Sequence, residues 1–207
     1  MDADFSVEFG GEAAALELPW RDAEGRLQYV ELRGNAAAVE QIAEARQFPA
    51  LRRLLTEINA ETSAWMTAKC DVWAERAEAG ENLYGAAFVQ GCYVDVVLAG
   101  EAERLRESLT VHENAARRIA RQMEEDEELE ASAEIVVRRC YFHRNALHCN
   151  ATEGEAMEES DAGCCLTLFL SGFGRTAEEA AERWTRALEV AGKCLRETRL
   201  EEERAKG

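Results

Sequence analysis

The residue types that most readily bind a metal gather in one segment of this chain, between positions 140 and 165. Thiolate and imidazole are the ligands that zinc prefers. The cysteines and histidines of this segment are Cys140, His143, His148, Cys149, Cys164 and Cys165. They form no paired Cys-x2-Cys knuckle, and strand alternation would put Cys140 and His143 on opposite faces. We therefore expect no metal and no cofactor, with a metal site in this segment as the alternative.

A cysteine activated by a histidine is a second kind of chemistry that these residue types allow. Cys92 or Cys140 could meet His112 or His143 if the fold brings them together. His112, however, lies on the apolar stripe of an expected helix, where a buried neutral imidazole is the commoner outcome. The sequence predicts no catalytic residue and leaves open whether the protein is an enzyme.

Known catalytic and phosphate-binding motifs are missing from the sequence. There is no Gly-x-Ser-x-Gly, no His-Glu-x-x-His and no Gly-x-x-x-x-Gly-Lys. An isolated Gly-x-Gly occurs at residues 172–174 before an expected helix. A strand-to-helix turn that needs glycine's conformational freedom explains it.

Aromatic and charged side chains recur at every second position of three expected strands, which places them on one face of a sheet. This predicted ligand or partner face consists of Trp65, Lys69, Asp71, Trp73, Tyr93, Asp95, Arg139, Tyr141 and His143, and Thr67 shares it. Alternation turns the intervening residues toward the helices, namely Met66, Ala68, Cys70, Val72, Phe88, Cys92, Val94, Val96 and Leu98. Aromatic residues and arginine are enriched at protein interfaces. Burial under the first hairpin or under another subunit would explain the face equally well.

Acidic residues are concentrated between Glu124 and Asp161, where 12 acidic residues face 3 basic ones, within a chain of net charge −17. Carboxylates at the end of a helix oppose its dipole, so they do not serve helix stability. A solvated stretch that keeps the protein soluble is the simplest interpretation, and a docking surface for a basic partner is the alternative.

Three helical segments must position these residues. The first runs from near Asn35 to Ile58 with a break near Phe48, which Pro49 causes, and the third begins with the capping pair Thr176 and Glu179. The second has apolar positions spaced by four and three residues. Those positions are Leu105, Leu109, His112, Ala116, Ile119 and Met123.

An internal repeat organises the expected strands. Three strand-like runs end in the same way, at Gly34, Gly100 and Gly172, and each precedes a helical segment. A further strand-like run lies before each of them, at residues 14–20, 65–73 and 134–143. We predict an α+β fold of three ββα repeats that form a mainly antiparallel sheet with helices on one face, containing a ferredoxin-like βαββαβ portion. A pseudo-threefold arrangement and separate halves are the alternatives.

The repeat implies a single domain over residues 1–198, with units at about 5–60, 61–130 and 131–198. Residues 199–207 are charged and have no apolar face, so we expect a projecting tail.

Composition narrows the function classes. With 47% hydrophobic and 31% charged residues the chain is of globular type, and its acidity disfavours nucleic acid as a partner. No apolar run reaches the roughly 20 residues that cross a bilayer, so we expect no membrane partner. Seven scattered cysteines indicate reduced thiols in a cytoplasm.

We expect a cytoplasmic, non-catalytic domain that binds a protein partner or forms a homo-oligomer. The alternative is a small-molecule-binding or enzymatic domain that uses the same face, with Asp71, Asp95, Arg139 and His143 as its polar groups.

Overall fold

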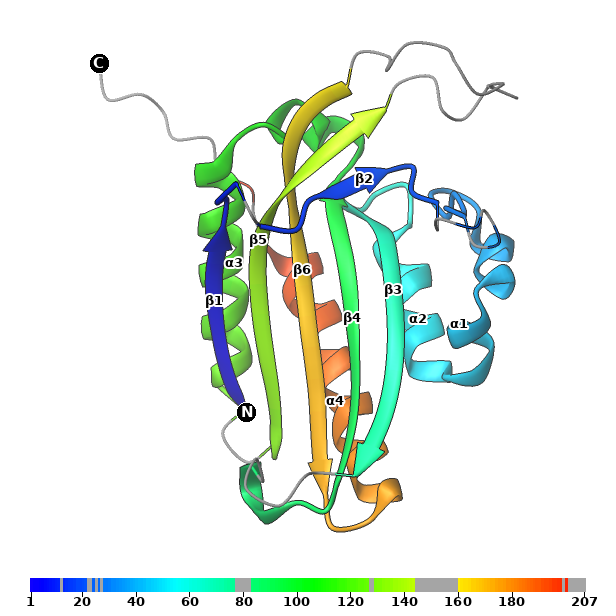
Figure 1. Ribbon diagram of the computed structural model, residues 1–207, viewed down its shortest axis with the longest axis vertical. Helices are drawn as coiled ribbons and strands as arrows, with labels where there is room; N and C mark the ends of the chain where they lie inside the picture. Colours follow the sequence, from blue (N-terminus) through cyan, green and yellow to red (C-terminus); the bar gives the residue numbers. More distant parts are fainter. Residues whose placement is uncertain are drawn as a thin grey trace.

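One six-stranded sheet runs through the computed structural model, which describes residues 1–11, 13–21, 24, 26, 28–76, 83–126, 129–143, 160–198 and 200 (Figure 1). Its strands are β1 (Asp2–Glu8), β2 (Leu16–Leu18), β3 (Trp65–Arg76), β4 (Phe88–Leu98), β5 (Ala131–His143) and β6 (Ser160–Gly174). The strand order is β1-β5-β6-β4-β3. Strands β3 to β6 pair antiparallel, whereas β1 and β2 both pair parallel with β5. The fold is therefore α+β, with a mixed but mostly antiparallel open sheet.

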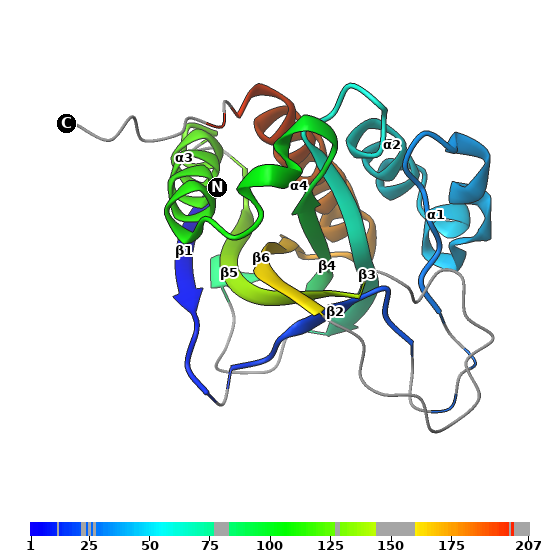
Figure 2. The ribbon, with the colours of Figure 1, turned by 90° about the horizontal axis from the view of Figure 1, so that it is seen from above.

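Helices cover one face of this sheet, and β2 lies on the other side (Figure 2). The helices are α1 (Ala43–Gln47), α2 (Pro49–Ile58), α3 (Leu109–Glu124) and α4 (Ala177–Glu197). Three short 3-10 segments are η1 (Ala36–Gln41), η2 (Leu83–Gly85) and η3 (Gly100–Leu105). We call the face away from the helices the open face.

The sequence signals for the helix ends act largely as expected. The Thr176 hydroxyl accepts a hydrogen bond from the backbone N–H of Glu179 at the start of α4. Pro49 is the first residue of α2, so the predicted break at Phe48 is confirmed. Asn35 precedes a 3-10 segment rather than an α-helix, and its side chain makes no capping hydrogen bond.

Two apolar clusters lie on opposite faces of the sheet. The larger one joins the helices to the sheet through fully buried residues such as Leu55, Ile119 and Leu168. The smaller one, which we call the second core, lies on the open face. It consists of Leu18, Met66, Ala68, Val97, Ala99, Cys140, Phe142 and Cys165. In Figure 1 the final part of β5, with β2 beside it, crosses in front of β4 towards β3, which covers this end of the open face.

The predicted repeat is only partly present. Two strands followed by helical segments do occur three times along the chain. However, residues 30–34 form no strand, and β1, which we did not predict, supplies the first strand instead. Strands β1 and β2 do not pair with each other as a hairpin but bind β5 one after the other. The order βαββαβ is present from β2 to β5, but these strands do not form a ferredoxin-like antiparallel sheet, because β2 pairs parallel with β5 and β6 lies between β5 and β4.

The three glycines of the repeat are not equivalent. Gly34 follows an irregular segment and Gly100 follows β4, both with positive φ, whereas Gly172 lies inside β6. Because β4 and β6 are antiparallel, Gly100 and Gly172 lie at opposite ends of the sheet. Gly172 is needed for close packing and not for a turn. A methyl group there would lie 2.2 Å from the backbone nitrogen of Trp184 in α4.

The described part of the chain has no helix that is long and apolar enough to cross a membrane. The predicted tail at 199–207 falls almost wholly outside the described residues.

Replacement of Gly172 by alanine should separate α4 from β6, because the backbone atoms that its methyl group meets cannot rotate away. We expect the free energy of unfolding, measured by urea denaturation, to fall by about 3 kcal/mol. The control is Gly10→Ala, whose methyl group meets nothing within 4 Å, and it should change stability by less than about 0.5 kcal/mol. Equal stabilities of the two variants would contradict this packing.

Candidate functional site

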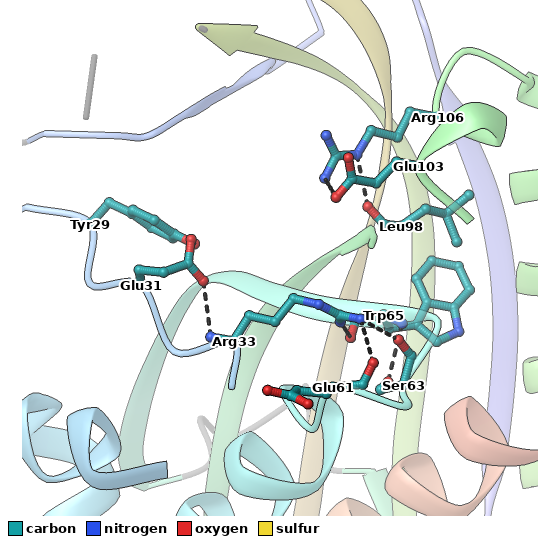
Figure 3. Close-up of polar contacts among 9 residues, drawn as sticks. All are labelled: Tyr29, Glu31, Arg33, Glu61, Ser63, Trp65, Leu98, Glu103 and Arg106. Atoms are coloured by element: carbon teal, nitrogen blue, oxygen red, sulfur yellow. Dashed lines mark hydrogen bonds and ion pairs between the residues drawn. The ribbon is translucent and has the colours of Figure 1, made fainter. Parts of the chain in front are cut away.

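The described residues between Leu16 and Arg33, namely 16–21, 24, 26 and 28–33, cover the end of the open face that is nearest to β2. The Trp20 indole N–H donates to the carbonyl oxygen of Ala68 in β3 at 2.8 Å. Further along, the guanidinium group of Arg33 donates to the carbonyl oxygens of Glu61, Ser63 and Trp65, as Figure 3 shows. These bonds fasten the covering segment to the edge strand of the sheet.

A second arginine fixes the neighbouring end of β4. The Arg106 Nε donates to the carbonyl oxygen of Leu98 at 2.7 Å (Figure 3). Its guanidinium lies 4.5 Å from the Phe142 ring centroid. Both arginines therefore hold the cover of the open face in place.

Two cavities lie under and beside this cover, and both are lined by Lys69 and Tyr93. The small cavity, of about 230 Å³, is lined by Ala14, Ala15, Leu16, Lys69, Tyr93, Asp95, Arg138, Thr167 and Phe169. The large cavity, of about 400 Å³, has walls that include Trp20, Gln28, Leu32, Gln41, Glu44 and Asp71. Ligand sites are typically concave and mostly apolar, with a few polar groups that converge.

Lys69 lies between two aromatic rings at the junction of the cavities. Its ammonium nitrogen is 5.0 Å from the Trp20 ring centroid and 5.9 Å from that of Tyr93, which are cation–π distances. Among the described residues, no oxygen accepts a hydrogen bond from this ammonium group.

Asp95 forms the polar floor of the small cavity. Its side chain is only 7% exposed, and its Oδ1 accepts a short hydrogen bond, 2.5 Å, from the Thr167 hydroxyl. Its second oxygen has no hydrogen-bond partner among the described residues. Burial raises the pKa of Asp95, and the Thr167 hydrogen bond and the charges of Arg138 and Lys69 offset this only in part.

Arg138 closes the cavity from β5. Its Nε lies 3.1 Å from the Glu8 carboxylate, and its guanidinium lies 5.3 Å from the Phe169 ring centroid. The Phe169 and Tyr93 rings are themselves neighbours, with centroids 6.2 Å apart. The cavity therefore combines two cations, one buried carboxyl group and two aromatic rings.

Lys69, Asp71, Trp73, Tyr93 and Asp95 lie on the open face, as predicted. The first, third and fourth are half-buried, and Asp71 is exposed. The Trp73 indole covers Gly91, where a methyl group would lie 2.5 Å from the ring.

The predicted place of Trp65 on the open face is wrong. Trp65 is 1% exposed and packs in the larger core against His112, with ring centroids 6.2 Å apart. A register shift between Thr67 and Lys69 explains the error, because a β-bulge at Ala68 reverses the alternation. Met66 and Ala68 consequently belong to the second core on the open face.

Arg139, Tyr141 and His143 are also not on the face of Asp95. Arg139 pairs across the sheet with Cys164, a residue of the larger core, and its guanidinium lies 5.6 Å from the Phe9 ring centroid. Arg138, one residue earlier, occupies the predicted position. The predicted face assumes that Cys140 points toward the helices. In the structure Cys140 packs in the second core, on the open face. Three further cavity residues were not identified from the sequence. Two of them, Thr167 and Phe169, lie in an apolar run, and Trp20 lies in an irregular segment.

The cysteines that the structure describes are free thiols, and all of them but Cys70 are buried. No group of three or more metal-ligating side chains occurs among the described residues, and His148 and Cys149 lie outside them. Burial raises the pKa of the Cys92 and Cys140 thiols to about 12, which keeps them protonated. His112 is buried, and its Nδ1 is hydrogen-bonded to the carbonyl oxygen of Ser108 at 2.8 Å rather than to a thiol.

Part of the acidic segment between Glu124 and Asp161 makes contacts within the chain. Asp126 pairs with Arg186 at 3.1 Å, and Glu130 pairs with Arg183 at 2.6 Å. These two ion pairs connect the segment between α3 and β5 to α4. Residues 127–128 and 144–159 of this segment lie outside the described residues.

The burial of Asp95 predicts a pH-dependent stability difference. Because its folded pKa is raised, Asp95 contributes stability that is fully present below its unfolded pKa, about 4, and lost as pH rises through the folded pKa. The Asp95→Asn variant cannot ionise. Its free energy of unfolding, minus that of the wild type, should therefore increase from pH 4 to pH 7 in urea denaturation.

The exposed Asp71→Asn variant is the control, because its carboxylate keeps its hydration in the folded protein. A difference for Asp95→Asn that stays constant or falls with pH would contradict the burial of this carboxyl group.

Comparison with protein-family models, with curated proteins and with solved structures finds no match to this chain. The function must therefore be argued from the geometry of the two cavities.

Proposed function

We propose that this protein binds a small molecule in the paired cavities beside β3, with Lys69 and Tyr93 at the centre of the site. The observation that carries the proposal is the pair Lys69 and Asp95. Each has hydrogen-bonding capacity without a partner among the described residues, and both line the same small cavity.

The position of Asp95 supports a ligand. Its side chain is only 7% exposed, yet its second oxygen is not among the fully buried atoms without a partner, so it stays accessible from the small cavity. An apolar residue would suit this position better if it served only to pack the sheet. Perturbed carboxyl groups in a concave site are characteristic of functional sites.

We assign binding and no reaction to the site. We also keep the cytoplasm as the proposed location, because the described cysteines are free thiols, as expected in a reducing compartment.

The four tryptophans allow one experiment to test the proposal. Trp20 lines the large cavity, Trp73 lies on the open face outside both cavities, and Trp65 and Trp184 are buried among the helices. We would label the protein with 5-fluorotryptophan and record 19F spectra during titration with indole, phenylacetate, phenethylamine and adenosine. At least one of these should shift the Trp20 resonance saturably while Trp65 and Trp184 stay unchanged.

The Lys69→Met variant should weaken this binding at least tenfold, because it removes the ammonium group at the junction of the cavities. The matched control is Lys193→Met, on the exposed side of α4, which should bind as the wild type does. An unchanged Trp20 resonance with all four compounds would contradict the proposal, and so would equal binding by both variants.

Association with another protein, or with a second copy of this chain, is a second candidate function. It is favoured by the half of the open face away from β2, which no described segment crosses in Figure 1. Trp73 stands there half-buried on β3. Partly exposed aromatic residues are frequent at the centres of interfaces.

Self-association would make the mass measured by light scattering rise with concentration and would shift the Trp73 resonance, leaving Trp20 unchanged. A Trp73→Ser variant should then stay monomeric at all concentrations. A monomeric wild type with a constant Trp73 resonance would exclude self-association through this face.

A further inference from the structure

The polar groups that face the small cavity include more free donors than free acceptors. The Lys69 ammonium has three N–H groups and no acceptor among the described residues. Arg138 uses its Nε for Glu8, and its two terminal nitrogens have no acceptor there. The second oxygen of Asp95 is the one acceptor of these three side chains that remains free. A ligand that satisfies this site must therefore be rich in acceptor oxygens.

The charges point in the same direction. Glu8, the partner of Arg138, has a side chain that is 42% exposed, so water screens it and it neutralises the arginine incompletely. Burial raises the pKa of Asp95, which weakens the repulsion that its carboxyl group exerts on an anion. In the lining of the small cavity two cations, Lys69 and Arg138, stand beside one carboxyl group, that of Asp95, whereas the carboxylates of Glu44 and Asp71 line the adjoining large cavity.

The remaining walls are apolar in part, and the polar residues Gln28, Gln41, Glu44 and Asp71 line only the large cavity. The Tyr93 and Phe169 rings and Leu16 border the small cavity, and Trp20, Leu32 and Leu55 border the large cavity that adjoins it. These groups suit an aromatic or aliphatic body more than a sugar or a polyamine.

We propose that the site binds a small organic acid, with its carboxylate in the small cavity between Lys69 and Arg138 and its apolar body in the large cavity. This inference rests on the function proposed above. A carboxylate fits better than a phosphate, because the described wall of the small cavity comes from strands and the segment before β2. It offers no helix N-terminus, which phosphate sites commonly use.

Four compounds that share one ring test this assignment. They are phenylacetate, its neutral amide, the cationic phenethylamine and phenyl phosphate. Calorimetric titration at pH 7 should give a Kd for phenylacetate at least tenfold lower than for the other three, and only phenylacetate should shift the Trp20 resonance at low concentration. A tenfold change corresponds to about 1.4 kcal/mol of binding free energy.

Variants of the two cations separate charge from shape. Lys69→Met and Arg138→Gln should each weaken phenylacetate at least tenfold and leave the amide unchanged, whereas Lys69→Arg should retain most of the affinity. Lys193→Met is the control for the loss of one positive charge. Its affinity for phenylacetate should equal that of the wild type.

The outcomes distinguish this inference from the proposal on which it rests. If the amide or the amine shifts Trp20 saturably and binds as tightly as phenylacetate, the cavity binds ligands but the assignment to acids is wrong. If phenyl phosphate binds more tightly than phenylacetate, the site prefers a phosphate to a carboxylate, and the assignment to organic acids is also wrong. If none of the four compounds shifts Trp20, both proposals fail for this class of ring.

Discussion

The pairing of two separate strands with one edge of β5 is the interaction on which the rest of the structure depends. Residues 2–8 bind the first half of β5 and residues 16–18 bind its second half, both in parallel register. Because β2 is held on the curved end of β5, the chain that follows it must cross the open face. That crossing brings Leu18 into the second core and Trp20 to the carbonyl oxygen of Ala68. Without this pairing, the cavities would have no cover.

The β-bulge at Ala68 is the second constraint, and it acts at the opposite edge of the sheet. It turns Met66 and Ala68 toward the second core and Trp65 and Thr67 toward the helices. Asn59 confirms the orientation of Thr67, since its amide donates to the Thr67 hydroxyl at 2.7 Å. Lys69 follows the bulge directly and points to the open face beside Trp20 and Tyr93. Bulges commonly redirect a side chain next to a functional site.

The helices and the central strands could be predicted from the sequence, because each carries its own periodic signal. The stripe of α3, the cap of α4 and the alternation of β4 are all local patterns, and the structure confirms them. The first unit was misjudged because β1 and β2 are defined by distant pairing with β5. Residues 30–34 have strand-like composition, but the structure gives them no strand partner.

The same distinction applies to the candidate site. Lys69, Tyr93 and Asp95 were found because they lie on strands with regular alternation. From the sequence we chose Arg139 instead of its neighbour Arg138. The three residues before them, Ile135, Val136 and Val137, are all apolar, so no alternation shows which face each position occupies. The choice between Arg138 and Arg139 depends on whether Cys140 faces the helices or the second core, and only the folded chain decides that.

Thiol labelling tests the covering of the open face most directly. Cys140 and Cys165 lie in the second core, and Cys92 and Cys164 lie in the core beneath the helices. Native wild-type protein, treated with iodoacetamide at pH 8 and analysed by mass spectrometry, should label all four slowly, since burial raises their thiol pKa values. In a Leu18→Ser variant, whose β2 no longer packs on this face, Cys140 and Cys165 should label at least tenfold faster while Cys92 and Cys164 stay protected. Rapid labelling of Cys140 in the native wild type, or equal protection of all four cysteines in the variant, would contradict the account.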